Sequence, residues 1–159
     1  MISGQFLFLF SALGAMNGIF LAIYFFSRRP HRLANSMLGA LLLAISVRTA
    51  KSTFYFFNPN LAVEFLQFGL SACLLIGPLT YLYVHYHLSD LRQDVAGREW
   101  CWHLGLSFFV IALGVLFPYA EYRFIWRHST YGIHAFWFLY LLAAGWELWR
   151  SRASLFDDV

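Results

Sequence analysis

Two cations stand in a stretch of sequence that is otherwise apolar enough to cross a membrane. Arg48 and Lys51 lie between Ala34 and Phe57, where most other residues are aliphatic, aromatic or small. A charged side chain is costly in hydrocarbon, so such residues usually face a partner, a water-filled cavity or a ligand. Arginine can also bind a carboxylate through two parallel hydrogen bonds. These two residues are therefore the first candidates for binding chemistry.

Further polar side chains are expected beside these cations. The two cations are three residues apart and share a helix face, which Ser52 and Tyr55 continue. The next apolar segment begins on the same side of the membrane and carries Glu64, Gln67 and Ser71 along one face. We expect all seven residues to form one cluster in the outer third of the bilayer.

Two interpretations of this cluster remain open. In the structural one, Glu64 pairs with Lys51 or Arg48 and holds two helices together. In the functional one, two cations against one carboxylate leave a positive charge that suits a small anionic or lipidic ligand. Such a ligand, for example a fatty acid, enters from the outer leaflet or the periplasm. Lys51 is also near enough to the outer surface to extend its ammonium group into water.

The elements that must position this cluster are five apolar segments. The chain has 159 residues, of which 60% are hydrophobic and 12% charged, whereas soluble domains average about 25% charged residues. Each segment approaches the roughly 20 residues that cross a bilayer. The expected fold is therefore an all-α polytopic membrane protein: one domain over residues 1–159, with the lipid bilayer as its surroundings. The predicted spans are 5–27, 34–57, 61–88, 100–119 and 128–149.

The distribution of arginine predicts the orientation of this bundle. The connections on one side, together with the C-terminal segment, carry most of the basic residues, and the other side has only Arg123 and Arg127. Basic residues favour the cytoplasmic side, so we expect the N-terminus outside and the C-terminus in the cytoplasm, in a bacterial inner membrane. The arginines of the predicted cytoplasmic side are Arg28, Arg29, Arg32, Arg92, Arg98, Arg150 and Arg152.

The first span carries a helix-packing motif. Gly14 and Gly18 form G-x-x-x-G, which lets two helix backbones approach closely, and Asn17 is placed to hydrogen-bond across such a contact. Two interpretations stay open: packing against the second or third span of the same chain, and association with a second copy or another membrane protein.

The third span contains Gly77 followed by Pro78. Proline has no backbone N–H, so we expect a kink at this point. The kink is either purely architectural or a hinge that transmits an outer event to the cytoplasmic end.

The sequence offers no recognisable catalytic centre. It contains no H-E-x-x-H, C-x-x-C, Walker or G-x-S-x-G motif. Among the histidines, His85 or His87 could share a depth with His103, which is the one pair that would suit a haem. Glu147 and Arg150 look like a surface ion pair. We expect no metal, no cofactor and no enzymatic activity.

Three runs of sequence resemble a known family. They are Leu41–Ser52, Gln67–Val84 and Leu116–Tyr119, and they look like the N-terminal membrane domain of membrane-anchored AraC-family transcriptional regulators. The resemblance covers roughly residues 34–119. The matching positions are Asn35, Arg48, Lys51, Ser52, Gly69, Gly77, Pro78 and Tyr81.

The resemblance implies a sensor that receives a signal in the membrane and delivers it to the cytoplasmic side. In that family a helix-turn-helix domain follows the spans, whereas this sequence stops at Val159 without one, so we expect this chain to bind no nucleic acid itself. The expected function is a non-enzymatic sensory or ligand-binding domain. The alternative is a small accessory or assembly subunit of a larger membrane complex or transporter.

Overall fold

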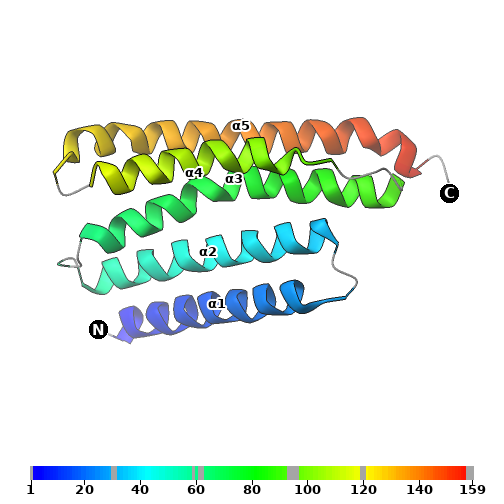
Figure 1. Cartoon of the computed structure of the whole chain (residues 1–159). Helices are drawn as coiled ribbons and strands as arrows, with labels where there is room; N and C mark the ends of the chain where they lie inside the picture. Colours follow the sequence, from blue (N-terminus) through cyan, green and yellow to red (C-terminus); the bar gives the residue numbers. More distant parts are fainter. Residues whose placement is uncertain are drawn as a thin grey trace.

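A computed structural model describes residues 2–29, 32–58, 60, 63–92, 97–118 and 121–156. The described residues form five α-helices and no strand, which confirms the expected all-α fold. Successive helices run antiparallel, as their short connections predict (Figure 1). The helices are α1 (Ile2–Ser27), α2 (Leu33–Phe57), α3 (Val63–Arg92), α4 (Trp100–Leu116) and α5 (Arg123–Phe156).

Three of the helices are long and apolar enough to cross a membrane. The qualifying segments are Gln5–Ser27 in α1, Leu33–Phe57 in α2 and Gln67–Leu91 in α3. Helix α4 is apolar but has 17 residues, about 26 Å at 1.5 Å per residue, which is slightly less than the hydrocarbon thickness of about 30 Å. Helix α5 has 34 residues and is not among the qualifying segments. The chain is therefore a helical bundle with three candidate membrane spans.

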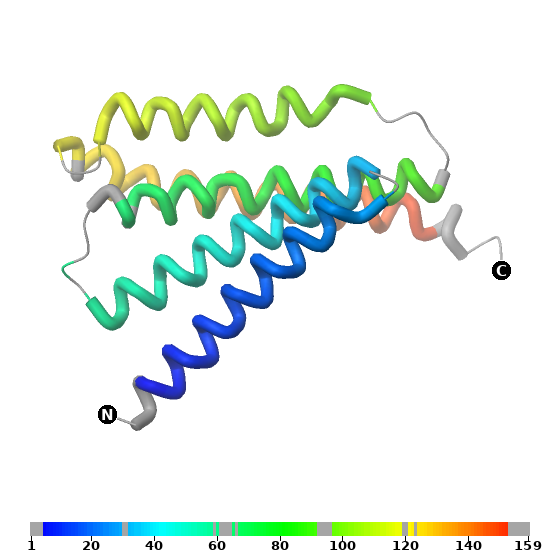
Figure 2. The backbone as a smooth tube through the Cα atoms, turned by 60° about the horizontal axis from the view of Figure 1, so that its bottom comes forward, coloured from blue at the N-terminus to red at the C-terminus, as the bar shows by residue number. Residues whose placement is uncertain are grey.

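Helix α3 is the centre of the bundle. In the described chain it packs against α2, α4 and α5, while α1 packs against α2 alone. Figure 2 shows α1 as the outermost helix of one side and α4 set apart along the other. The largest buried cluster joins α2 to the second half of α3 around Leu82 and Tyr86. This arrangement makes α3 the element through which α2, α4 and α5 can influence one another.

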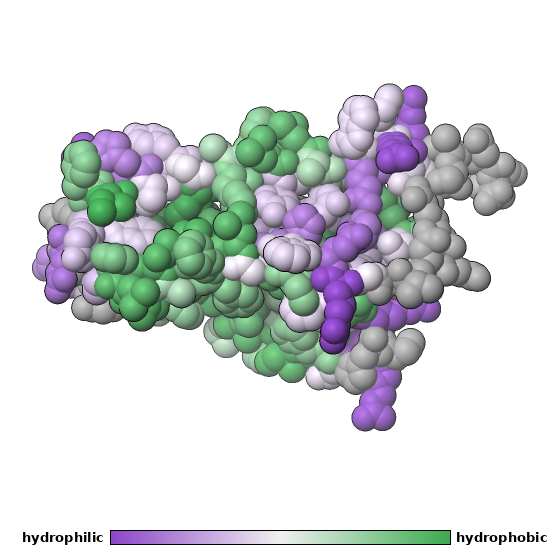
Figure 3. Space-filling view, turned by 45° about the horizontal axis from the view of Figure 1, so that its top comes forward, coloured by the Kyte–Doolittle hydropathy of each residue, from purple (hydrophilic) through white to green (hydrophobic). Residues whose placement is uncertain are grey.

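The two ends of the bundle differ in charge. One end holds the α1–α2 and α3–α4 connections and the last turns of α5 (Figure 1). We call it the basic end, and there Arg32 forms an ion pair with Asp90 at 4.0 Å. On the face shown in Figure 3, hydrophobic side chains cover much of the middle and hydrophilic ones gather toward the ends. The arginines of the basic end whose side chains the structure describes are Arg28, Arg29, Arg32, Arg98, Arg150 and Arg152.

Small residues bring α1 and α2 together, but only one glycine of the G-x-x-x-G motif takes part. A Cβ atom at Gly18 would collide with the Ser46 hydroxyl of α2, so this glycine lets the two helices pack closely without displacing that hydroxyl. A Cβ atom at Gly14 would meet nothing within 4 Å. Asn17, three residues after Gly14, is also exposed. The two glycines share one face of α1, but only at Gly18 is α2 close enough to touch that face.

Helix α3 continues through Pro78 as one helix from Val63 to Arg92. Pro78 is fully buried. At Gly77, an added Cβ atom would lie 3.0 Å from the Trp137 Cα atom and 3.2 Å from the Tyr140 Cβ atom. Gly77 therefore permits close packing of α3 on α5, and the predicted kink and hinge remain predictions.

Candidate functional site

The two cations of α2 are engaged by residues of their own helix. The Arg48 guanidinium donates a hydrogen bond to the Ser52 hydroxyl at 2.5 Å. The Lys51 ammonium lies 5.6 Å from the centre of the Tyr55 ring, a distance suited to a cation–π contact. The four residues thus form the local group that the helical spacing predicts. The Glu64 side chain, their predicted counter-charge, lies outside the described residues.

Gln67 and Ser71 lie on a different face of α3 from the one that Lys51 touches. A Cβ atom at Gly69 would collide with the Lys51 side chain, so the stem of that lysine packs directly on Gly69. At 100° per residue, positions 67 and 71 are about 160° to 200° from Gly69 around the helix. Both residues instead line a groove beside α4. The structure thus divides the predicted cluster between two surfaces.

This groove, which we call the acyl groove, is a cavity of about 690 Å³ between α2, α3 and α4. Its lining from Leu104 to Val115 extends about 17 Å along α4. Nearly all of the lining is aliphatic or aromatic, and the polar side chains Gln67 and Ser71 are both near the end remote from the basic end. The lining residues are Phe26, Ala40, Leu43, Ala44, Val47, Gln67, Phe68, Ser71, Ala72, Leu75, Leu79, Leu104, Phe108, Ile111, Gly114, Val115 and Pro118.

Polar contacts attach α4 to α3 at both ends of the acyl groove. At the remote end, the Gln67 side-chain amide donates to the carbonyl oxygen of Gly114. At the basic end, the Tyr86 hydroxyl donates to the Gly97 carbonyl at 3.0 Å and accepts from the Trp100 N–H at 3.3 Å. Between these ends, part of α4 lines the groove, and Val110 and Ile111 also pack against the buried cluster of Cys73, Leu74 and Ile133. Helix α4 is therefore attached by polar contacts near its ends and by apolar packing between them.

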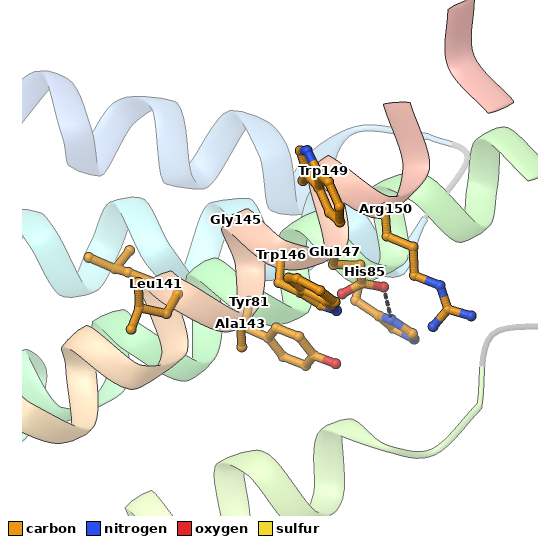
Figure 4. Close-up of a pocket in the computed structure, with 10 residues that line it drawn as sticks. Tyr81, His85, Leu141, Ala143, Gly145, Trp146, Glu147, Trp149 and Arg150 are labelled. Carbon is orange, nitrogen blue, oxygen red and sulfur yellow. Dashed lines mark hydrogen bonds and ion pairs between the residues drawn. The ribbon is translucent and has the colours of Figure 1, made fainter. Parts of the chain in front are cut away.

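A second polar group lies at the basic end and links three elements. The His85 Nδ1 atom of α3 is 2.7 Å from a carboxylate oxygen of Glu147 in α5, and its Nε2 atom is 3.3 Å from an oxygen of Glu99 beside α4. The second Glu147 oxygen is enclosed and has no hydrogen-bond partner among the described residues. Figure 4 shows the His85 and Glu147 side chains meeting beside Arg150. Glu147 is therefore a bridge to α3, unlike the surface pair with Arg150 that the sequence suggested.

Aromatic contacts extend this group along α3. The Tyr81 ring stacks on His85, with centroids 5.9 Å apart, and also contacts His103 of α4 at 5.1 Å. The His103 Nδ1 atom is 3.0 Å from the Tyr140 hydroxyl of α5. The sequence did not identify this network, although the i, i+4 spacing of Tyr81 and His85 and the position of Glu147 at the same end were available signals.

Neither the polar residues of the acyl groove nor the group around His85 forms a recognisable metal centre. In the residues that the structure describes, no set of three His, Cys, Asp or Glu side chains is close enough to hold one ion. No family model, curated protein or solved structure matches this chain. Its function is therefore inferred from the geometry of the chain itself.

Proposed function

We propose that this chain is a non-enzymatic, membrane-embedded sensory domain that binds an amphiphile in the acyl groove and passes the signal to the basic end. The ligand is an amphiphile with one acyl chain, such as a fatty acid. Its acyl chain lies between α2 and α4, and its polar group is next to Gln67 and Ser71.

The acyl groove is the observation that carries this proposal. Its volume of about 690 Å³ is within the range of roughly 300–1,000 Å³ typical of ligand pockets. Such pockets are mostly apolar with a few polar groups that orient the ligand. The apolar lining suits a hydrocarbon chain, and the Ser71 hydroxyl oxygen can accept a hydrogen bond from a protonated carboxyl head while it donates to the Gln67 carbonyl at 3.1 Å.

The attachments of α4 supply a route for the signal. A ligand that separates α4 from α3 strains the contacts at Gly114 and at Tyr86. The Tyr86 contacts and the His85–Glu99 contact hold the start of α4 at the basic end. Occupation of the groove therefore changes how α3, α4 and α5 are joined at that end. Pro78 lies on α3 between the Gln67 and Tyr86 attachments. A hinge there would move one attachment relative to the other.

The direction of signalling follows from charge. Basic residues favour the cytoplasmic side of a membrane, so we place the basic end in the cytoplasm and the polar end of the acyl groove in the outer leaflet. This placement puts the N-terminus outside and takes all five helices across an inner membrane. The resemblance to the membrane domain of AraC-family regulators supports the same direction, from outer leaflet to cytoplasm.

Filling the acyl groove tests the proposal. Ala40 is half-buried and lines the groove, whereas Ala112 is exposed on α4 and does not line it. We expect Ala40→Phe to weaken binding of a fluorescent fatty acid by purified protein at least tenfold, because the ring occupies space that the chain needs. The matched variant Ala112→Phe should bind as the wild type does. Equal binding by all three proteins would show that the fatty acid is not held in this groove.

A role as an accessory subunit of a larger membrane complex is the second candidate. The observation that favours it is the exposed apolar surface of α1, which packs only against α2 in the described chain. Purification from membranes in a mild detergent separates the two functions. A different protein recovered in equal amount supports the subunit, and a bound amphiphile supports the sensor.

A further inference from the structure

We propose that the exposed face of α1 is a dimer interface, on which two copies of this chain pack side by side in the same orientation. The inference rests on the membrane placement proposed above. It does not depend on the ligand of the acyl groove, so either proposal can fail without the other.

A regular row of side chains follows this face of α1. Its members alternate in steps of four and three residues, which is the heptad spacing by which two parallel helices pack. The row, which we call the α1 seam, is Phe6, Phe10, Leu13, Asn17, Phe20 and Tyr24. Its apolar members are all more than half exposed. A second helix can therefore contact the seam along its whole length.

The α1 seam is directed away from the rest of the chain. Ala15 and Ala22 are buried on the side of α1 that packs against α2. At 100° per residue, both are about 140° to 160° round the helix axis from Asn17. The contact with α2 thus leaves the seam free for another molecule.

Asn17 indicates that this other molecule is a protein and not only lipid. It lies near the middle of α1 and is exposed, and its amide makes no hydrogen bond within the described part of the chain. At this depth no water is available, so an unpaired amide facing lipid is unfavourable. A polar partner at the same depth removes that penalty.

A second copy of this chain supplies a polar partner for Asn17 at the same depth. A carboxamide both donates and accepts hydrogen bonds, so two Asn17 side chains satisfy each other across a twofold axis. Two copies inserted in one membrane have the same orientation, and in a parallel pair the same seam positions meet. Gly14 lies beside the seam and has open space at its Cβ position, which allows the two backbones to approach.

Disulfide cross-linking of the full chain in vesicles tests the geometry of this dimer. The free cysteines Cys73 and Cys101 are first replaced by alanine and serine. Single cysteines are then placed on the seam, as Leu13→Cys or Phe20→Cys, or off it, as Ile23→Cys, at an equally exposed position. We expect mild oxidation to give covalent dimers with the two seam cysteines and little with the third.

Replacement of the amide tests its chemistry. In an energy-transfer assay between labelled copies in vesicles, we expect Asn17→Leu to weaken dimerisation about tenfold, while its exposed neighbour Met16→Leu changes it little. A monomeric wild type, equal cross-linking by all three cysteines, or unchanged dimerisation of Asn17→Leu overturns the proposal. Recovery of a different protein bound to α1, in place of a second copy, also overturns the proposal. The cross-linking experiment keeps Asn17, so it remains informative if that variant folds poorly.

Discussion

At the scale of single residues, the two cations of the candidate span α2 contact neutral side chains of their own helix. Arg48 hydrogen-bonds to Ser52, and Lys51 packs its stem on Gly69 while its ammonium contacts Tyr55. These contacts lower the cost of each cation without a ligand. The residues that best suit ligand binding are instead the apolar lining of the acyl groove and the two polar side chains at its remote end.

The close contact at Gly77 gives a prediction about stability. The backbone and side chains of α5 leave no room for a larger residue there, because an added Cβ atom would lie 3.0 Å from the Trp137 Cα atom. We expect Gly77→Val to lower the free energy of unfolding by about 1–3 kcal/mol. Gly105 of α4 has nothing within 4 Å of its Cβ position, so Gly105→Val is the control for helix propensity. Thermal unfolding in detergent measures both, and equal losses would contradict the proposed role of Gly77.

At the scale of the helices, α4 is the element that we expect to move. It lines the groove and has the least extensive contact with α3 among that helix's neighbours, although it is attached by Gln67 and Tyr86 near its ends and by Val110 and Ile111 between them. The other neighbours of α3 are held differently, since α2 shares the largest buried cluster with it and α5 packs closely at Gly77. A change in the acyl groove should therefore move α4 before it moves α2 or α5.

Loss of the Tyr86 hydroxyl should loosen one end of α4. In Tyr86→Phe the Gly97 carbonyl and the Trp100 N–H lose their shared partner, and because both residues are exposed the expected cost is about 0.5–1.5 kcal/mol per hydrogen bond. We expect faster hydrogen exchange over residues 98–106, with little change in α2. Tyr83→Phe is the control, because Tyr83 lies near the same end of α3. Exchange that is unchanged in α4, or faster throughout the chain, would show that Tyr86 does not fasten this helix specifically.

At the scale of the whole molecule, the sequence predicted where the helices begin and end better than it predicted which helices and side chains lie next to one another. Long apolar runs separated by short polar connections were enough to place all five helices, with ends within four residues of those observed for α1 to α4, whereas the predicted 128–149 is five and seven residues short at the two ends of α5. Periodicity along α2 also grouped Arg48, Lys51, Ser52 and Tyr55, because that grouping is local. It could not show that Gln67 faces α4 while Gly69 faces Lys51, since this depends on how α3 is rotated within the bundle.

The network around His85 was missed for a related reason. His85, Glu99 and Glu147 come from three separate elements, and only the packing of α3 against α4 and α5 brings them together. Gly14 and Gly18 look equivalent in the sequence and share a helix face, but only Gly18 is close to α2 in the structure. Contacts between elements therefore decide the candidate site, and one sequence without its packing leaves them open.

Mapping where an acyl chain binds would test the proposed sensor at its binding site. A fatty acid with a photoreactive group in the middle of its chain is bound to the detergent-solubilised protein, activated, and located by mass spectrometry of the peptides. We predict labels on the groove side of α4, at Leu104, Phe108 and Ile111, which are lost when excess unlabelled fatty acid competes. Labels spread evenly over the exposed surfaces of α1 and α5, or labels that competition does not remove, would contradict binding in the acyl groove.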